Sequence, residues 1–311
     1  MKPQYELVII GGGAAGLAAA QYGARANLST LVIEEMAPGG QALLIDQLEN
    51  YPGILEPVAG FDLAEIMKTQ AERFGAEFIT ASVEKMEKGK NFFQVSTSEG
   101  LVKAEAVILA TGAKHRHLGI PGEEAFSGRG VSYCATCDGP FFKGKKILVV
   151  GGGDAACDEA MYLAKLSDKI VMIHRRDRFR AQKALAERVL ANSSIDVRFN
   201  TVALEIKGGQ KVESVVLKNL ESGKSEEEAF DAVFVFIGSD PNVSLVPDAA
   251  KDESNSIVTD DRMATNIPGL FAAGDVRVSP FRQIVTACSD GAVAAHAASQ
   301  YIDEIRGAAY R

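Results

Sequence analysis

Two glycine-rich turns, Gly11–Gly16 and Gly151–Ala156, each directly follow four apolar residues in this chain of 311 residues. An alanine-rich stretch and a second apolar run come after each turn, and the second runs lie at 30–33 and 170–173. Each copy therefore predicts a strand, a helix and a second, parallel strand. A glycine turn in that setting binds the phosphates of a dinucleotide at the amino end of its helix. One such motif alone is weak evidence, but two in matching settings indicate two nucleotide-binding domains.

Both halves of the chain continue with a similar layout. Short apolar or alternating segments at 77–82, 92–96 and 102–109 predict an antiparallel meander that leads into a buried strand in the first half. Similar segments predict strands at 197–206, 212–219 and 232–237 in the second half. The periodicity of residues 62–74 predicts an amphipathic helix with Asp62 as its N-cap. The apolar face of that helix is expected to consist of Leu63, Ile66, Met67, Ala71 and Phe74.

Residues 258–300 do not continue the second copy. They contain a strand-and-turn motif at 269–276 and the start of an alanine-rich helix at 283–303. We therefore expect the second domain to be inserted into the first, with chain crossings near 113–118 and 239–243 that form a hinge. The expected fold class is α/β, with two Rossmann-like, three-layer (ββα) nucleotide-binding domains: 1–115 with 243–311, and 116–242.

The residue after the second strand of each copy contacts the adenosine ribose. In the first copy it is Glu34, whose carboxylate accepts hydrogen bonds from ribose hydroxyls and repels a 2′-phosphate. His174 stands at the same place in the second copy, followed by Arg175, Arg176 and Arg180. Arginine binds a phosphate dianion through paired, charge-assisted hydrogen bonds. We expect FAD at the first site and NADPH, rather than NADH, at the second; the alternative for the basic residues is a solvated surface turn.

Cys134 and Cys137 have the spacing of a small, reducible disulfide ring. The alternatives are a zinc half-site or two inert core cysteines, but zinc needs four ligands and no second pair follows. Asp138 is a candidate proton donor and acceptor for thiol exchange, or else a turn-forming residue. Cys157 and Cys288 have no such spacing and are expected to be small buried side chains.

The formal net charge of −8 and the pI near 5.2 argue against nucleic acid and anionic membranes as partners. The first residues lack the basic and apolar regions of a secretory signal, and four cysteines are too few for a secreted disulfide scaffold. We therefore expect a cytoplasmic protein with neither a bound metal nor a membrane segment.

The motifs together resemble those of the low-molecular-weight, flavin-dependent thioredoxin reductases, and the resemblance covers essentially the whole chain. Its most specific part is Cys134-Ala-Thr-Cys137-Asp138-Gly139, because many flavoproteins share the glycine motifs. The other matching segments are Gly11–Gly16, 39–41, 49–53, 110–113, 120–123, Gly151–Ala156, 174–181, 274–276 and 282–283.

The resemblance, together with the two glycine turns, implies the site residues. The FAD site is expected to comprise Gly11, Gly13, Ala14, Ala15, Gly16, Glu34, Gly40, Gln41, Asn50, Thr111, Gly112, Gly274, Asp275, Arg282 and Gln283. The NADPH site is expected to comprise Gly151, Gly153, Asp154, Ala155, Ala156, Glu159, His174, Arg175, Arg176 and Arg180, with Glu159 near the nicotinamide.

The disulfide precedes Gly151 closely in the chain, so it belongs to the NADPH domain. One rigid domain can hardly bring both the nicotinamide and the disulfide to a flavin held by the other, unless the two groups take opposite faces of the ring. We therefore expect that domain to rotate about its two crossings. The resemblance implies hydride transfer from NADPH to FAD, then to the disulfide, and then exchange with oxidised thioredoxin. It also implies that Cys137 lies next to the flavin, that Cys134 attacks the substrate, that Asp138 handles protons and that the protein is a homodimer.

Three other functions deserve comparison. A peroxide-reducing flavoprotein subunit shares this core but carries thioredoxin-like domains before it, whereas ten residues precede Gly11 here. A ferredoxin- or NADH-dependent relative should lack the basic residues at 174–176 and 180. A zinc- or flavin-binding interaction protein without turnover would show no bleaching of flavin absorbance by NADPH.

Overall fold

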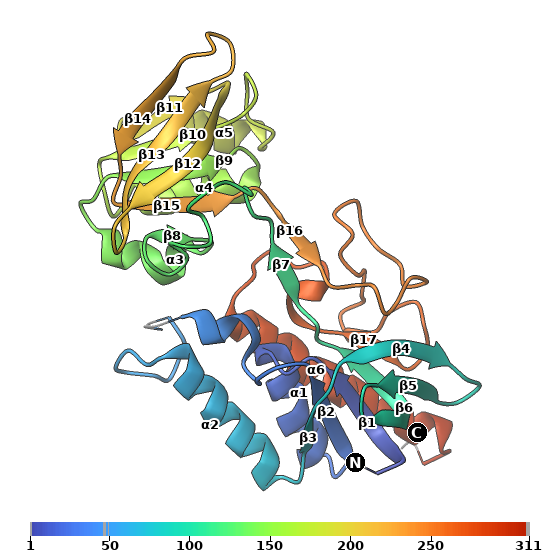
Figure 1. The fold of residues 1–311 in the computed structure, drawn as a ribbon. Helices are drawn as coiled ribbons and strands as arrows, with labels where there is room; N and C mark the ends of the chain where they lie inside the picture. The colour runs from blue at the N-terminus through green and yellow to red at the C-terminus, as the bar shows by residue number, and fades with distance from the viewer. Residues whose placement is uncertain (1, 46–47, 49, 309–311) are drawn as a thin grey trace. The chain divides into compact units, whose positions relative to one another are not determined.

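The computed structural model describes residues 2–45, 48 and 50–308. The chain divides into two compact units, which Figure 1 shows in ribbon form. Unit 1 consists of Met1–Lys114 and Asp240–Arg311, and unit 2 consists of His115–Ser239. Both ends of the chain therefore build unit 1, and unit 2 is a single inserted segment.

A largely parallel sheet forms the middle layer of unit 1, with the strand order β3-β2-β1-β6-β5-β4 and with β17 also paired to β6. Its strands β1, β2, β3, β6 and β17 run parallel, whereas β4 and β5 add an antiparallel extension. The bounds are Gln4–Ile10 for β1, Thr30–Glu34 for β2, Glu77–Thr80 for β3, Val83–Lys88 for β4, Phe93–Thr97 for β5, Gly100–Leu109 for β6 and Leu270–Ala272 for β17.

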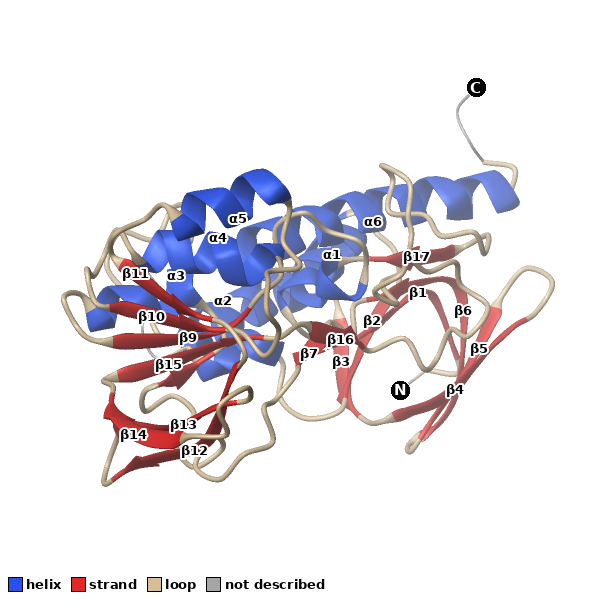
Figure 2. Cartoon of the chain, turned by 90° about the horizontal axis from the view of Figure 1, so that it is seen from above, coloured by secondary structure: helices blue, strands red, loops and turns tan. Residues whose placement is uncertain are grey.

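Successive side chains of β1 point to opposite faces of the sheet, so the core of unit 1 has two layers. Leu7 and Ile9 pack against the helices, and Val8 and Ile10 pack against the opposite layer, which includes β5. Figure 2 shows the helices gathered on one side of the strands. These helices are α1 (Ala14–Arg25), α2 (Gly60–Arg73) and α6 (Ile284–Ile305).

Helices α1 and α6 touch backbone to backbone at Gly291. A Cβ atom on Gly291 would lie 2.1 Å from the carbonyl oxygen of Ala15, which is closer than any real contact. We expect Gly291→Ala to lower the free energy of unfolding by about 2 kcal/mol, because the helices must separate. Helix propensity alone would predict stabilisation by roughly 1 kcal/mol.

Urea denaturation of Gly291→Ala against Gly209→Ala tests this prediction. The Cβ of the control would meet its nearest neighbour, a Glu213 side-chain oxygen, at 3.6 Å. A Gly291→Ala protein as stable as the control would show that the two helices can adjust.

A parallel sheet forms the middle of unit 2, with the strand order β11-β10-β9-β15-β8. Helices pack on one face, and the antiparallel sheet β12-β13-β14 packs on the other. The strands are β8 (Val131–Ser132), β9 (Ile147–Gly151), β10 (Ile170–Ile173), β11 (Ile195–Arg198), β12 (Thr201–Gly208), β13 (Val212–Asn219), β14 (Ser225–Ala229) and β15 (Ala232–Phe236). The helices are α3 (Ala135–Asp138), α4 (Asp154–Leu163) and α5 (Lys183–Leu190).

The two crossings pair with each other, as β7 (Ala113–His115) and β16 (Ser239–Pro241). On the unit 1 side, Thr111 and Asn242 are joined by two bonds: the threonine hydroxyl donates to the asparagine carbonyl at 2.7 Å, and the asparagine side-chain amide donates to the threonine carbonyl at 2.7 Å. Short 3-10 helices cover Gly40–Leu44, Gly139–Phe142 and Gly274–Val276.

The structure confirms the α/β fold class with its paired nucleotide-binding architecture, but some local predictions were wrong. Ala59 precedes the first residue of α2 without a side-chain cap, so Asp62 lies inside the first turn and is not the N-cap. Ile66 and Phe74 are 52% and 47% exposed, so they do not belong to the buried face of that helix.

Two predicted strand groupings also differ from the structure. Strand β3 pairs in parallel with β2 and is not part of the antiparallel meander. The expected strand 197–206 is divided between β11 and β12, and Asn200 between them has a φ of 51°. The left-handed conformation of Asn200 turns the chain from one sheet into the other.

Candidate active site

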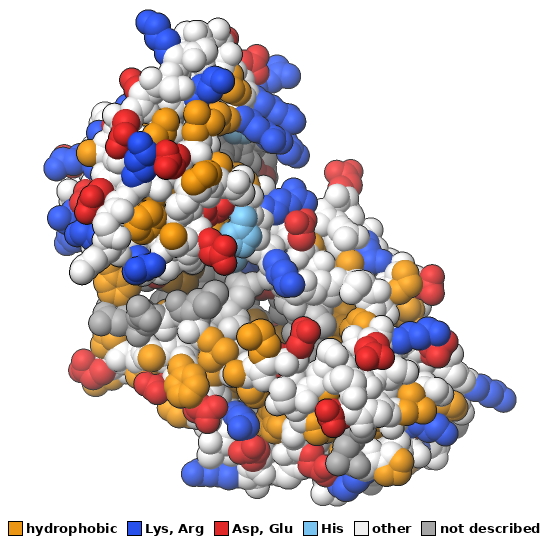
Figure 3. Space-filling model, in the orientation of Figure 1, with side chains coloured by type: hydrophobic (Ala, Val, Ile, Leu, Met, Phe, Trp, Pro, Cys, Tyr) orange, Lys and Arg blue, Asp and Glu red, His pale blue; other side chains and the backbone are white. Residues whose placement is uncertain are grey.

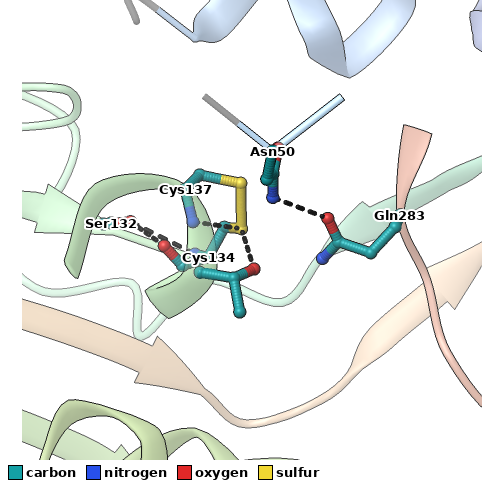
Figure 4. Close-up of a disulfide and its surroundings, with 6 residues drawn as sticks. Asn50, Ser132, Cys134, Cys137 and Gln283 are labelled. Atoms are coloured by element: carbon teal, nitrogen blue, oxygen red, sulfur yellow. Dashed lines mark hydrogen bonds between the residues drawn. A yellow bond between two sulfur atoms is a disulfide. The ribbon is translucent and has the colours of Figure 1, made fainter. Parts of the chain in front are cut away.

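Cys134 and Cys137 form a disulfide across the single turn of α3. Cys134 is the N-cap of this helix, and its Sγ accepts a hydrogen bond from the Cys137 amide at 3.2 Å. The Ser132 hydroxyl accepts from the Cys134 amide at 3.1 Å and donates to the Cys134 carbonyl at 3.3 Å (Figure 4). The backbone of the first cysteine is therefore fixed from the end of strand β8.

The disulfide lies at the same edge of the sheet as the glycine turn of unit 2. Ser132 on β8 and Val149 on β9 are both register partners of Phe234 on β15, so they stand at the same height. Cys134 comes two residues after Ser132, and Gly151 comes two residues after Val149. Strands β8 and β9 run in the same direction, so Cys134 and Gly151 lie toward the same edge of the sheet. One strand separates β8 from β9, so about 10 Å lies between the two backbones. The carboxyl edge of one sheet thus carries both the redox pair and a dinucleotide fingerprint.

A polar and aromatic cluster surrounds Tyr133, the residue before the first cysteine. The Tyr133 ring stacks on His115 with centroids 5.3 Å apart and meets the edge of His117 at 5.2 Å. Its hydroxyl donates to Glu123 at 2.9 Å and lies 2.8 Å from Nδ1 of His117. Burial and the Glu123 charge raise the pKa of Tyr133. Sequence reasoning missed this cluster, because its members lie far apart in the chain and carry no motif of their own.

The amino end of α4 faces the glycine turn of unit 2. Gly153 is its N-cap, without a side-chain cap, and a Cβ there would meet nothing within 4 Å. A Cβ on Gly151 would lie 2.4 Å from the carbonyl oxygen of Phe236, so only glycine fits between the two strands. The Arg180 amide donates to the Gly152 carbonyl at 2.7 Å, which draws the basic segment to the turn.

Two buried polar atoms of unit 2 lack a hydrogen-bond partner among the described residues, namely Oε2 of Glu159 and Nε2 of His174. Burial, with Asp158 nearby, raises the pKa of Glu159 to about 7. Burial and the charges of Arg176 and Arg175 lower the pKa of His174. Buried polar groups normally have partners, so both atoms are suited to contact a bound ligand.

The raised pKa of Glu159 gives a stability prediction for the nucleotide-free protein. Between pH 4.5 and about pH 7 the folded chain keeps a proton that the unfolded chain has lost. Stability therefore falls as the pH rises through this window. Glu159→Gln removes the effect, so its stability relative to wild type should increase by about 1–3 kcal/mol from pH 4.5 to pH 7.5.

Urea denaturation at both pH values measures that difference. Glu187→Gln, at an exposed position on α5, is the matched control, and its difference from wild type should change little with pH. A Glu159→Gln difference that is the same at both pH values would contradict the prediction.

The carboxyl ends of the parallel strands of unit 1 bring together residues from distant parts of the chain. Gly11 follows β1, Glu34 ends β2, Thr111 follows β6 and Asp275 follows β17. The Glu34 carboxylate accepts a hydrogen bond from the Gly12 amide at 2.6 Å. These positions form the expected crevice of a doubly wound sheet.

The glycines of the first turn have distinct local roles. A Cβ on Gly16 would lie 1.9 Å from the Gly11 carbonyl oxygen, so this glycine lets α1 approach β1. A Cβ on Gly13 would meet only Gly40, at 4.0 Å, which leaves the N-cap of α1 open. This arrangement suits a phosphate at the helix N-terminus.

Further candidate residues of unit 1 make hydrogen bonds through their side chains. The Asn50 side-chain amide donates to Gln283 at 3.2 Å (Figure 4), and the Gln41 amide donates to the Ala113 carbonyl. Arg282 donates to the Ser256 hydroxyl at 3.4 Å. Burial raises the pKa of Asp275, against an opposing effect of Arg282.

The residues that the structure describes contain neither a metal-binding cluster nor a membrane-spanning helix. No group of three or more His, Cys, Asp and Glu side chains in that part of the chain could hold a metal ion. Within the same residues, no helix has the length and apolar composition needed to cross a membrane.

Two nucleotide-binding sheets and a redox-capable disulfide are the parts of a nucleotide-dependent disulfide oxidoreductase. Comparison with known families gives the same class. Residues 5–291 match the model of the pyridine nucleotide-disulphide oxidoreductase family. The thioredoxin reductase of Treponema pallidum is 57% identical over 98% of this chain and all of its own length. That of Listeria innocua is 45% identical over 98% of this chain and 96% of its own.

A solved structure gives the same result. The thioredoxin reductase of Streptococcus pyogenes is 44% identical, has a TM-score of 0.90 and covers 98% of this chain and 100% of its own. The chain belongs to the thioredoxin reductases of the pyridine nucleotide-disulphide oxidoreductase family. Membership implies a flavin and a nicotinamide nucleotide as cofactors, and the resemblance predicted from the sequence is confirmed.

Proposed function

We propose that this chain uses NADPH and FAD to reduce the disulfide of a thioredoxin-like protein. The observation that carries the proposal is the position of the Cys134–Cys137 disulfide, level with the glycine turn of unit 2 at one sheet edge. A relay from a nicotinamide to a protein disulfide needs both groups. The partner follows from the relatives, which are named thioredoxin reductases.

Unit 1 fits FAD. The open N-cap of α1 suits its pyrophosphate, and a carboxylate at the end of β2, such as that of Glu34, suits the hydroxyls of a ribose. When bound, FAD supplies a two-electron relay between a nicotinamide and a disulfide. The residues that would hold it are those of the crevice: Gly11, Gly13, Ala14, Ala15, Gly16, Glu34, Gly40, Gln41, Asn50, Thr111, Gly112, Gly274, Asp275, Arg282 and Gln283.

Unit 2 fits NADPH. The uncapped amino end of α4 suits its pyrophosphate, and the unpartnered atoms of Glu159 and His174 are available to it. Arg175, Arg176 and Arg180 are exposed beside the turn, and Figure 3 shows Lys and Arg side chains gathered on the side of unit 2 where α5 lies. Guanidinium groups there favour the 2′-phosphate of NADPH over the free hydroxyl of NADH.

The cysteines carry the exchange with the partner. In the reduced dithiol, the Cys134 thiolate attacks one sulfur of the partner disulfide, and the other partner sulfur leaves and takes up a proton. The Cys137 thiolate then attacks Cys134 in this mixed disulfide. That step reforms the Cys134–Cys137 bond and releases the second partner thiol. Asp138, the last residue of α3, is assigned the proton transfers of this cycle.

We assign the alternation between the two half-reactions to rotation of unit 2 about β7 and β16. The disulfide and the nucleotide turn share that unit, so they must reach the flavin of unit 1 in turn. Crosslinking the two units should permit one half-reaction and block the other, and full turnover of the crosslinked protein would rule rotation out.

An anaerobic titration tests the proposed function directly. NADPH should bleach the flavin absorbance of the purified protein, and added oxidised thioredoxin should restore it. NADH at the same concentration should act much more slowly. A protein that binds no flavin, or one that NADPH cannot bleach, would refute the proposal.

The proposal includes a homodimer in a reducing compartment such as the cytoplasm. Several apolar side chains of α1 and α2 are exposed on unit 1, which favours association with a second copy: Tyr22, Phe61, Ile66. Light scattering should give twice the mass of one chain.

A further inference from the structure

A partly buried ion pair lies beside the turn that follows β17. Arg277 and Asp290, from α6, are joined by a bond of 3.1 Å, and their side chains are only 16% and 14% exposed. The same Asp290 oxygen, Oδ2, also accepts a hydrogen bond from the Gly274 amide at 3.1 Å. The Nε of Arg277 donates to the Thr259 hydroxyl at 2.8 Å.

The Gly274 amide belongs to a turn with little freedom to move. Gly274 has a φ of 76°, and a Cβ there would lie 2.9 Å from the Cβ of Ala15 at the start of α1. The turn is therefore confined between α1 and the Asp290 carboxylate. Asp275 is the next residue, so the direction of its side chain depends on the peptide that Asp290 holds.

The charge of the pair also affects Asp275. Burial raises the pKa of Asp275, the charge of Arg282 lowers it, and the charge of Asp290 raises it again. Arg277 offsets the Asp290 charge from a distance of 3.1 Å. Without Arg277, the carboxylates of Asp275 and Asp290 would repel each other, and the charge of Arg282 alone would oppose that effect on Asp275. Removing one side of a pair that is largely shielded from solvent is costly, because the remaining charge is left uncompensated.

We infer that Arg277 and Asp290 are positioning residues that hold the Gly274–Asp275 turn in the shape that binds FAD. The inference rests on the proposed function, because the flavin assignment of unit 1 belongs to it. Asp290 supplies the acceptor that orients the turn, and Arg277 keeps the charge of that acceptor neutralised.

The rate of FAD release from the holoprotein after dilution, followed by the rise in flavin fluorescence, tests this inference. Arg277→Met should release FAD at least about 10-fold faster than wild type, because it leaves Asp290 uncompensated. Adding Asp290→Asn removes the charge but keeps an acceptor oxygen for Gly274. The double variant should therefore return to within about 3-fold of wild type. Arg262→Met is the matched control, because Arg262 is an exposed arginine in the turn before β17 whose side chain donates to Gln300 of α6.

A second comparison covers the case in which Arg277→Met does not fold, as judged by circular dichroism. The double variants Arg277→Met/Asp290→Ala and Arg277→Met/Asp290→Asn carry the same charge and differ in the acceptor for Gly274. The alanine form should release FAD about 10-fold faster. The inference would be overturned if these two double variants released FAD at equal rates. It would also be overturned if Arg277→Met released FAD at the wild-type rate. A wild-type protein without flavin would contradict the proposed function instead.

Discussion

Replacing Cys134 by serine is expected to abolish thioredoxin reduction while NADPH still bleaches the bound flavin. A hydroxyl at this position can neither form the disulfide nor attack another, so the exchange loses its nucleophile. Turnover with thioredoxin should fall at least about 10³-fold. The flavin half-reaction uses residues of the two nucleotide sites and should keep its rate within about 3-fold.

The two cysteines can be told apart by trapping. Cys137→Ser leaves Cys134 free to attack but removes the thiol that resolves the mixed disulfide. This variant should accumulate a covalent complex with oxidised thioredoxin, seen by non-reducing electrophoresis, and Cys134→Ser should not. Cys157→Ala is the control, because that thiol is buried in α4 and burial raises its pKa to about 11. If Cys134→Ser forms the complex instead, the assigned roles are reversed.

Replacing Arg175 and Arg176 by alanine is expected to raise the KM for NADPH about 10²-fold. Hydrogen bonds between charged partners each contribute about 1.5–3 kcal/mol, so losing two of them accounts for this effect. The KM for NADH should change less than about 3-fold, because NADH has no 2′-phosphate to lose. The preference between the two nucleotides would then nearly disappear.

Arg178→Ala is a matched control, since Arg178 is exposed in the same segment but is not assigned to the site. Steady-state oxidation of both nucleotides, with a thioredoxin as acceptor, measures the effect. An equal loss of affinity for NADPH and NADH would show that these arginines support the fold of the segment and do not read the phosphate.

The sequence predicted those parts of the site that depend on local chemistry. The two glycine turns, the ribose positions Glu34 and His174, and the cysteine pair all follow from short spacings within one supersecondary unit. The structure agrees with this reasoning about placement, because parallel strands bring their carboxyl ends to one edge. The residue contacts with each cofactor stay predictions.

Features that depend on tertiary packing could not be predicted. The Tyr133 cluster joins residues from the first crossing to the strand before the disulfide, and Asp290 reaches Gly274 from another element. Neither pairing has a spacing that sequence can show. Asp62 was a wrong N-cap because α2 begins at Gly60, directly after the extended residue Ala59, and does not use a side-chain cap.

The hydrogen-bonded pairing of β7 with β16 has an evolutionary consequence. Unit 2 leaves unit 1 and returns to it at neighbouring points. A segment connected in this way can be replaced by another domain without distorting the rest of the protein. Recombination at 114–115 and 239–240 would transfer the redox cysteines together with the proposed nicotinamide site. One genetic event would then change the electron donor and the disulfide chemistry together and leave the proposed flavin unit intact.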